Sequence, residues 1–353
     1  MKILKEKIMN KIEIIQPDDW HVHFRDNEIM KAVVPETSRS FGRALVMPNL
    51  VPPIISGKDA LDYKKRINGS IPSNHTFLPF MTIYLNEKTN KEDLEKSFNS
   101  GCIFGAKLYP AGATTNSASG VKNIEKIMPI LEIMEKIGMP LLIHGEVVDS
   151  KVDIFDREKI FIETILENIC RKFPNLKITL EHITTNDAVK YINESKSRIA
   201  ATITPQHLAL NRNAILVGGI KPHYYCLPIL KREEHRLALV EAATSGNAKF
   251  FLGSDTAPHI SSDKESDCGC AGIFNATYCI SILAEIFDKN NSITKLENFI
   301  SLNGASHYNL KPNKTKITLV KDDISINFID SIKVKDNRIV VFKPDFPVFW
   351  RVL

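Results

Sequence analysis

Short apolar runs and amphipathic stretches alternate along most of this 353-residue chain. The apolar runs lack the one-in, one-out alternation of a half-buried strand, which is typical of parallel strands that are buried on both faces. They predict eight strands, at Trp20–Phe24, Arg43–Met47, Thr76–Leu85, Ile103–Leu108, Pro140–His144, Lys177–His182, Ile199–Thr204 and Lys249–Gly253.

The stretches between these runs place apolar residues at helical spacing. Glu28–Ser38 is a weaker candidate, because Pro35 would interrupt a helix there. Eight strands that alternate with helices predict an α/β fold, a (β/α)8 barrel of the TIM type. The other predicted helices are Ser56–Ile67, Lys91–Phe98, Ile124–Ile137, Asp156–Arg171, Asn186–Asn193, Arg232–Thr244 and Ala276–Phe287.

The chain changes character after Leu310, where Lys316–Val320 and Arg338–Phe342 are predicted as short strands. The first barrel strand begins near the N-terminus, so we expect no substantial domain before it. These features predict one domain over residues 1–353, with the barrel in 12–310 and a small C-terminal appendage in 311–353. Met9 is an alternative start to Met1.

The composition is that of a globular protein with a large core, at 43% hydrophobic and 25% charged residues. The net charge of +5 comes from scattered basic residues, and no Lys- or Arg-rich block is present. We therefore expect a small-molecule substrate and no nucleic-acid partner.

No apolar run approaches the roughly 18 residues that a membrane-spanning helix needs, so no membrane partner is expected. The N-terminal residues lack the continuous apolar segment of a signal peptide. The six cysteines are then expected to be free thiols in a cytoplasmic protein. The Cys268–Cys270 pair lacks the second pair of a zinc ribbon, and we interpret it as part of a structural loop.

The segment Asp19–Arg25 carries the strongest local chemical signal, because it contains two histidines two residues apart. Alternate side chains of a strand point the same way, so His21 and His23 would project into one space. Such a pair can clamp a metal ion, although an isolated pair of this kind also occurs by chance.

Further polar residues follow other predicted strands. His144 and His182 end the fifth and sixth strands, Asp255 follows the eighth, and Lys107 lies near the end of the fourth. These ends converge on one face of a barrel, where active sites form. Together with His21 and His23, the histidines and the aspartate are too many ligands for one tetrahedral zinc, but they suit two metal ions that share a bridge.

A lysine is unusual at a metal site, because an ammonium group repels cations. With a lowered pKa, the neutral amine of Lys107 could combine with carbon dioxide to form a carbamate, which is an anionic bridge with two oxygens. The alternative is that Lys107 forms an ion pair with a carboxylate, and the residues alone leave both interpretations open.

The chain resembles the amidohydrolase superfamily and, within it, the shorter bacterial-type dihydroorotases. The resemblance extends from about Ile12 to just beyond the eighth strand, and the tail after Leu310 contributes little. It rests on D-W-H-V-H-F-R at 19–25, M-P-N-L at 47–50, A-K-L-Y-P at 106–110, A-T-T-N-S at 113–117, H-G-E at 144–146, E-H-I-T-T at 181–185, T-P-Q-H-L at 204–208, G-S-D-T-A-P-H at 253–259 and C-G-C-A-G at 268–272.

The resemblance implies two zinc ions per subunit, bridged by carbamylated Lys107 and a hydroxide. His21, His23 and Asp255 would hold the more buried zinc, and His144 and His182 the other. It also implies that Arg25, Asn49 and His259 grip the substrate carboxylate and that backbone groups of Leu227 and Ala271 meet a pyrimidine ring. Thr114 and Thr115 would belong to a mobile loop that closes on the substrate.

The implied activity is the reversible cyclisation of N-carbamoyl-L-aspartate to L-dihydroorotate in pyrimidine synthesis, with Asp255 as the proton-transferring catalytic residue and a homodimer as the assembly. A hydantoinase-like or allantoinase-like enzyme would share the metal ligands, but its substrates do not need the carboxylate site of Arg25, Asn49 and His259. A metal-free scaffold would lack ligands, and none is missing.

Overall fold

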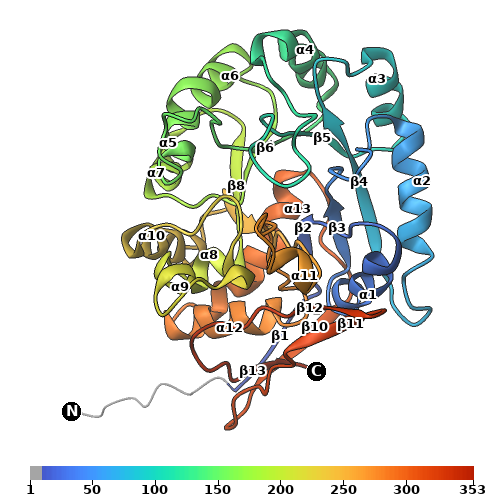
Figure 1. Ribbon diagram of the computed structural model, residues 1–353. Helices are drawn as coiled ribbons and strands as arrows, with labels where there is room; N and C mark the ends of the chain where they lie inside the picture. Colours follow the sequence, from blue (N-terminus) through green and yellow to red (C-terminus); the bar gives the residue numbers. More distant parts are fainter. Residues whose placement is uncertain (1–9) are drawn as a thin grey trace.

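The computed structural model describes residues 10–353, so the choice between Met1 and Met9 as the start lies outside the described residues. Its centre is an eight-stranded parallel sheet in the order β2-β3-β4-β5-β6-β7-β8-β9 (Figure 1). Backbone bonds from Asp255 N to His21 O (2.9 Å) and from His23 N to Thr256 O (3.0 Å) join the carboxyl end of the first strand to the segment that follows the last. The strands are β2 (Asp18–Val22), β3 (Arg43–Val46), β4 (Leu78–Leu85), β5 (Gly105–Leu108), β6 (Leu141–His144), β7 (Ile178–Glu181), β8 (Ile199–Ile203) and β9 (Phe250–Leu252).

Helices surround this sheet, so the predicted (β/α)8 barrel and all eight predicted strands are confirmed (Figure 1). Asp156–Arg171, predicted as one helix, forms two α-helices around a short π-helix. The helices are α1 (Asn27–Ser38), α2 (Gly57–Asn68), α3 (Lys91–Asn99), α4 (Met128–Ile137), α5 (Arg157–Phe161), α6 (Glu167–Lys172), α7 (Asn186–Glu194), α8 (Pro205–Ala209), α9 (Asn213–Leu216), α10 (Glu233–Thr244), α11 (Ser261–Lys264), α12 (Cys279–Lys289) and α13 (Asn303–His307); the short 3-10 and π segments are η1 (Ile124–Ile127), η2 (Ile162–Leu166), η3 (Pro222–Tyr224), η4 (Ile293–Lys295) and η5 (Asn298–Leu302).

Helix α1 corrects the expectation that Pro35 would interrupt a helix in Glu28–Ser38, because the helix continues through Pro35 to Ser38. Proline removes one backbone donor and crowds the preceding turn. Met30, Val33 and Val34 are buried on the inner face of this helix. The packing of these side chains against the barrel therefore outweighs the local cost of the proline.

A small second sheet combines both ends of the described chain. Strand β1 (Lys11–Ile15) pairs antiparallel with β10 (Lys316–Lys321), which pairs with β13 (Trp350–Val352). The predicted tail strands correspond to β10 and to β12 (Asn337–Val340), and β12 forms a hairpin with β11 (Ser331–Val334). Strand β1 was not predicted, and it lies beside the tail although about 300 residues separate the two in sequence.

The barrel interior is filled by a buried cluster that includes Trp20, Leu45, Leu142 and Phe251. The register between β2 and β3 shifts between Asp19 and Val22. Such a bulge re-aims side chains, so Trp20 and the adjacent His21 both lie inside the barrel. Trp20 packs in the apolar cluster inside the barrel, and His21 is the first of the polar side chains that line the cavity next to this cluster.

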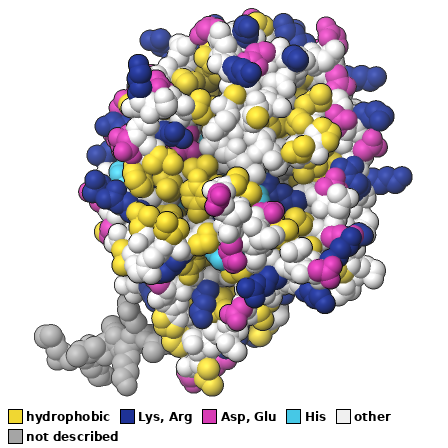
Figure 2. Space-filling view, in the orientation of Figure 1, with side chains coloured by type: hydrophobic (Ala, Val, Ile, Leu, Met, Phe, Trp, Pro, Cys, Tyr) yellow, Lys and Arg dark blue, Asp and Glu magenta, His cyan; other side chains and the backbone are white. Residues whose placement is uncertain are grey.

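The outer surface carries charges of both signs. Figure 2 shows Lys and Arg side chains interspersed with Asp and Glu over the visible face, with apolar groups between them. No helix within residues 10–353 is long and apolar enough to cross a bilayer.

Candidate metal centre and substrate site

The strand ends on one face of the barrel bring most of the predicted site residues around a single enclosed cavity of about 20 Å³. Lys107 lies beside it on β5 and is fully buried. The cavity is lined by His21, His23, Arg25, Asn49, Tyr109, Thr114, Thr115, His144, His182, Leu227, Asp255, Ala257, Ala271 and Gly272.

His21, His23 and Asp255 form the tightest group of potential ligands. Asp255 Oδ1 lies 3.3 Å from His21 Nε2 and 3.1 Å from His23 Nε2, and the two Nε2 atoms are 3.1 Å apart. His23 Nδ1 lies 2.8 Å from Asn49 Oδ1, so Nδ1–H can donate to the amide while Nε2 faces the cluster. The lone pairs needed for a cation therefore converge on one point.

A second group consists of His21, Glu181 and His182, whose potential ligand atoms all lie within 4.8 Å of one another. His182 Nδ1 is buried without a hydrogen-bond partner in the described part of the chain. A metal ion would satisfy this atom. His144 lies beside His182, with ring centroids 4.8 Å apart, and its Nε2 donates to Glu146 Oε2 at 2.7 Å.

Three of the residues around this cavity have a left-handed backbone, with φ of 56° at Arg25, 45° at His182 and 47° at Asp255. This conformation is uncommon for residues other than glycine, and it often occurs at functional sites. At His182 it breaks the strand alternation, so that the consecutive residues Glu181 and His182 both direct potential ligand atoms to the same cluster.

Lys107 forms an ion pair with Glu181, which lies on β7, and both side chains are fully buried. This pair corresponds to the second interpretation of Lys107 in the sequence. Burial lowers the pKa of Lys107, while the Glu181 carboxylate opposes the change. The structure thus contains a carboxylate partner for the lysine, and carbamylation of Lys107 remains a prediction.

The electrostatics of the cluster favour a cation. Burial alone would lower the pKa of His21, but the carboxylates of Glu181 and Asp255 raise it to about 9. His23 lacks two such partners, and burial lowers its pKa to about 4. A negative potential that holds a proton between these side chains would also attract a divalent cation, so the residues present fit a metal ion.

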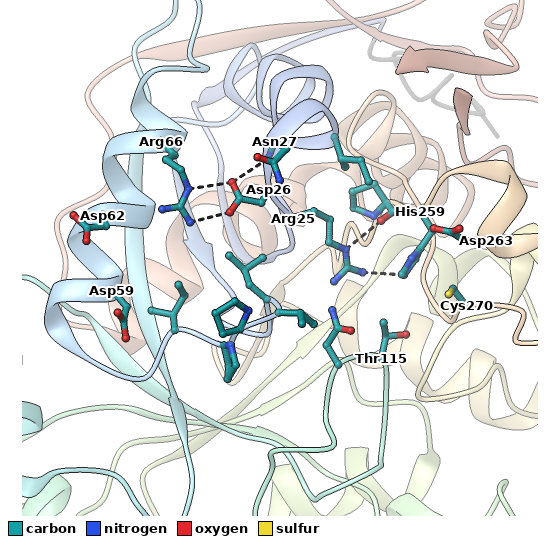
Figure 3. A pocket seen from close by; sticks show the side chains of 18 residues that line it. Arg25, Asp26, Asn27, Asp59, Asp62, Arg66, Thr115, His259, Asp263 and Cys270 are labelled. Carbon is teal, nitrogen blue, oxygen red and sulfur yellow. Dashed lines mark hydrogen bonds and ion pairs between the residues drawn. The ribbon is translucent and has the colours of Figure 1, made fainter. Parts of the chain in front are cut away.

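Arg25 and His259 form a second polar centre beside the first (Figure 3). Arg25 Nε donates to Pro258 O at 3.1 Å, and one terminal nitrogen lies 3.0 Å from His259 Nε2. The other terminal nitrogen is buried without a partner among the described residues. Burial lowers the pKa of His259 to about 2, so its ring is neutral. A guanidinium with a free donor is suited to a carboxylate.

Thr115 and Ala271 come from two loops that meet over the cavity. Thr115 Oγ1 donates to the Ala271 carbonyl at 3.1 Å, and His259 Nε2 lies 3.0 Å from the same oxygen. Asn49 Nδ2 donates to Thr115 O at 3.1 Å. Leu227 lines the cavity, as Thr114 does. The loop predicted to close over the site therefore covers it here.

A larger hollow of about 560 Å³ lies outside this loop (Figure 3). It shares Arg25 and Thr115 with the inner cavity and has His259 and Cys270 on its wall. The sharing of these residues makes the hollow the outer vestibule of the site.

Two buried carboxylates of the site were missed in the sequence analysis. Glu181 contacts Lys107 and His21, and Glu146 accepts from His144. Both belong to motifs that were recognised, H-G-E and E-H-I-T-T. The signal that could have found them was a carboxylate close in sequence to a candidate histidine ligand. Carboxylates that contact metal-binding histidines are common at metal sites.

Comparison with known proteins agrees with this geometry. The model of the Amidohydrolase family matches residues 14–348, so the fold and the site define a hydrolase of this class. The dihydroorotase of Sinorhizobium medicae is 52% identical over 345 residues, which are 98% of this chain and 99% of that protein. The chain therefore belongs to the dihydroorotase family of the amidohydrolases.

Solved structures support the same assignment. The crystal structure of dihydroorotase from Saccharomyces cerevisiae, in complex with 5-fluoroorotic acid, has a TM-score of 0.88 at 32% identity and covers 98% of each chain. An L-hydantoinase from Arthrobacter aurescens has a TM-score of 0.77 at 16% identity, covering 96% of this chain and 82% of that one. This second likeness is one of fold alone.

Proposed function

We propose that this chain is a dihydroorotase, which interconverts N-carbamoyl-L-aspartate and L-dihydroorotate. The observation that carries the proposal is the position of an Arg25 donor, unpaired among residues 10–353, beside a histidine and aspartate cluster within one cavity. A substrate with a carboxylate at one end and a cyclic amide at the other matches these two centres.

The proposed metal ligands are His21, His23 and Asp255 for one zinc ion and His144 and His182 for the other, with carbamylated Lys107 between them. Zinc ions bound there would lower the pKa of a shared water and polarise the amide carbonyl. The convergence of His21, His23 and Asp255 atoms within 4.8 Å supports the first metal position, and His182 converges likewise with His21 and Glu181.

Asp255 is the proposed acid–base residue. Its Oδ1 lies at the centre of the cluster, 3.1 Å from His23 Nε2, so its carboxylate can accept a proton from the attacking water and pass it to the leaving ring nitrogen. The same group would act in reverse during cyclisation.

Arg25, Asn49 and His259 are proposed to bind the substrate carboxylate. The free Arg25 donor and the neutral His259 ring supply directional contacts to its oxygens. Hydantoin and allantoin do not require this carboxylate-binding centre, which favours dihydroorotate over them. The 5-fluoroorotic acid of the yeast relative is likewise a pyrimidine carboxylic acid.

Leu227 and Ala271 are proposed to meet the pyrimidine ring through backbone groups, with Thr114 and Thr115 in a lid. The inner cavity is about 20 Å³, whereas ligand pockets commonly measure about 300–1,000 Å³. The loop must therefore open to admit a substrate, and closing it would exclude water during the reaction.

The decisive test is an assay of purified, zinc-loaded protein with four substrates. We expect turnover of dihydroorotate and carbamoyl-aspartate, and little turnover of hydantoin or allantoin. Preference for hydantoin or allantoin would overturn the proposal. Elemental analysis of the same sample should find about two zinc ions per chain.

The proposed setting is a cytoplasmic enzyme that acts as a homodimer. All six cysteines lie within the described residues, and none forms a disulfide, as is usual in reducing compartments. Light scattering of the zinc-loaded protein would test the dimer.

A further inference from the structure

Lys264 is a buried lysine at the end of α11, with only 3% of its surface exposed. Its ammonium group donates to three backbone carbonyls, those of Tyr225 (2.8 Å), Cys270 (2.8 Å) and Gly272 (2.7 Å). An ammonium has three donors, and here all three are used. No ion pair with a carboxylate involves Lys264 in the described part of the chain.

The three carbonyls belong to two separate loops. Cys270 and Gly272 flank Ala271. The Ala271 carbonyl accepts a hydrogen bond from Thr115 Oγ1 and contacts His259 Nε2. Tyr225 lies two residues before Leu227, which lines the inner cavity. One side chain therefore joins the two loops whose backbone groups are proposed to hold the pyrimidine ring.

The loop around Gly272 has little freedom to adjust by itself. Gly272 has φ of 151°, and a Cβ there would lie 2.5 Å from Ala257 O and 2.9 Å from His259 Cδ2. Its N–H donates to Tyr225 O at 3.0 Å, which adds a direct bond between the two loops. The chain is packed so closely that a shift at Lys264 would be passed to Ala271.

An apolar side chain of similar length would fill this space without the cost of burying a charge. Burial lowers the pKa of Lys264 to about 8, with the thiols of Cys226 and Cys270 acting in the opposite direction. Burying this charge has an energetic cost, which the three hydrogen bonds and a contact of the ammonium with the Tyr225 ring, 5.9 Å from its centroid, help to offset.

From this geometry we infer that Lys264 is a positioning residue, which fixes the backbone of Leu227 and Ala271 for binding of the substrate ring. The inference rests on the proposed function, because it concerns the proposed ring-binding groups. It requires no contact between Lys264 and the substrate or a metal ion.

The test is the Lys264→Met variant, prepared with zinc and bicarbonate like the native enzyme. We expect the KM for dihydroorotate to rise by about tenfold or more, kcat to change by less than about threefold, and the zinc content to stay the same. Lys264→Gln keeps a neutral donor and should give an intermediate KM.

Lys177→Met is the matched control, since Lys177 is also buried, at 7% exposure, but precedes β7 at the opposite end of the barrel. It should leave KM unchanged even if it lowers thermal stability.

An unchanged KM in zinc-loaded Lys264→Met would overturn the inference, as would a loss of zinc equal to the loss of activity. If the Met variant does not fold, Lys264→Gln is judged by the same criterion. Failure of both to fold would assign Lys264 to folding and also overturn it. If native protein does not turn over dihydroorotate, the proposed function itself fails, which is a distinct result.

Discussion

Glu181 Oε1 lies 3.0 Å from His21 Nδ1, and both side chains are fully buried inside the barrel. The second oxygen of Glu181 pairs with Lys107. One carboxylate therefore contacts two proposed metal-holding side chains that come from two other strands. Glu181 Oε1 and His21 Nδ1 form an ion pair without hydrogen-bond geometry, since neither has a hydrogen-bond partner among the described residues. The negative charge of a carboxylate beside a ligating histidine makes that histidine a better ligand.

Glu181→Gln should weaken zinc binding by about 10–100-fold, because the amide places no negative charge beside the His21 ring. Competitive titration with a chelator measures this affinity directly. Glu285→Gln is the matched control, since Glu285 is also buried, at 3% exposure, but lies on α12 and accepts from Phe349 N. Equal zinc affinity in the native protein and Glu181→Gln would contradict the role assigned to the carboxylate.

Lys107→Ala should remove the proposed bridge and reduce activity by at least about 100-fold. The uncarbamylated side chain of Lys107 also forms an ion pair with Glu181, so the zinc content of the variant must be measured beside its activity. A small carboxylic acid added to the assay should restore part of the activity by occupying the gap. Normal activity and metal content in Lys107→Ala would show that the lysine is not a bridge.

The barrel could be predicted from the sequence because its signals are local. Most barrel strands are short, mainly apolar runs, although β2 (D-D-W-H-V) is not, and most helices carry their own periodic pattern. Strand β1 gives a weaker signal, since the burial of K-I-E-I-I is partial and its partner β10 lies at the other end of the chain. The prediction that Pro35 interrupts a helix was wrong for a different reason. The local cost of proline in a helix was overcome by packing of α1 against the barrel, which the sequence does not display.

The site was predicted less completely than the fold. The recognised motifs located the side chains that the structure gathers around one cavity, but they did not reveal how those side chains contact one another. Asn49, predicted to grip a carboxylate, also orients His23 through a 2.8 Å contact. Glu181 escaped notice because strand alternation would point it away from His182, and the left-handed backbone at His182 cannot be read from residue type.

The position of the reaction equilibrium should depend on pH, since cyclisation consumes one proton and releases one water. Lower pH therefore favours dihydroorotate, and the ratio of dihydroorotate to carbamoyl-aspartate should change by about tenfold per pH unit. Chromatography of both compounds after long incubation from either side measures this ratio. A ratio independent of pH would mean that the enzyme catalyses another reaction.

Asp255→Asn should lower kcat in both directions of the reaction, because an amide cannot accept and return the proton. A loss of about 100-fold or more in kcat is expected for a proton-transfer residue. Asp255 also contacts His21 and His23, so zinc content must be determined in the same preparation. Near-native kcat in a zinc-loaded sample would rule out Asp255 as the acid–base group.

Replacing Thr114 and Thr115 together with Ala tests the lid. Thr115 Oγ1 bonds to the Ala271 carbonyl at 3.1 Å, so its loss removes a contact that holds the loop over the cavity. Neither threonine is a proposed metal ligand, and the zinc content should therefore be unchanged. We expect kcat to fall by about tenfold in both directions, since a loop that closes less completely admits water and leaves the flexible carbamoyl-aspartate poorly oriented.

Ser119→Ala, at an exposed position of the same segment, should behave like the native enzyme. If the double variant retains native kcat with full zinc, the segment is a covering loop without a part in turnover, and access to the 20 Å³ cavity must come from movement elsewhere.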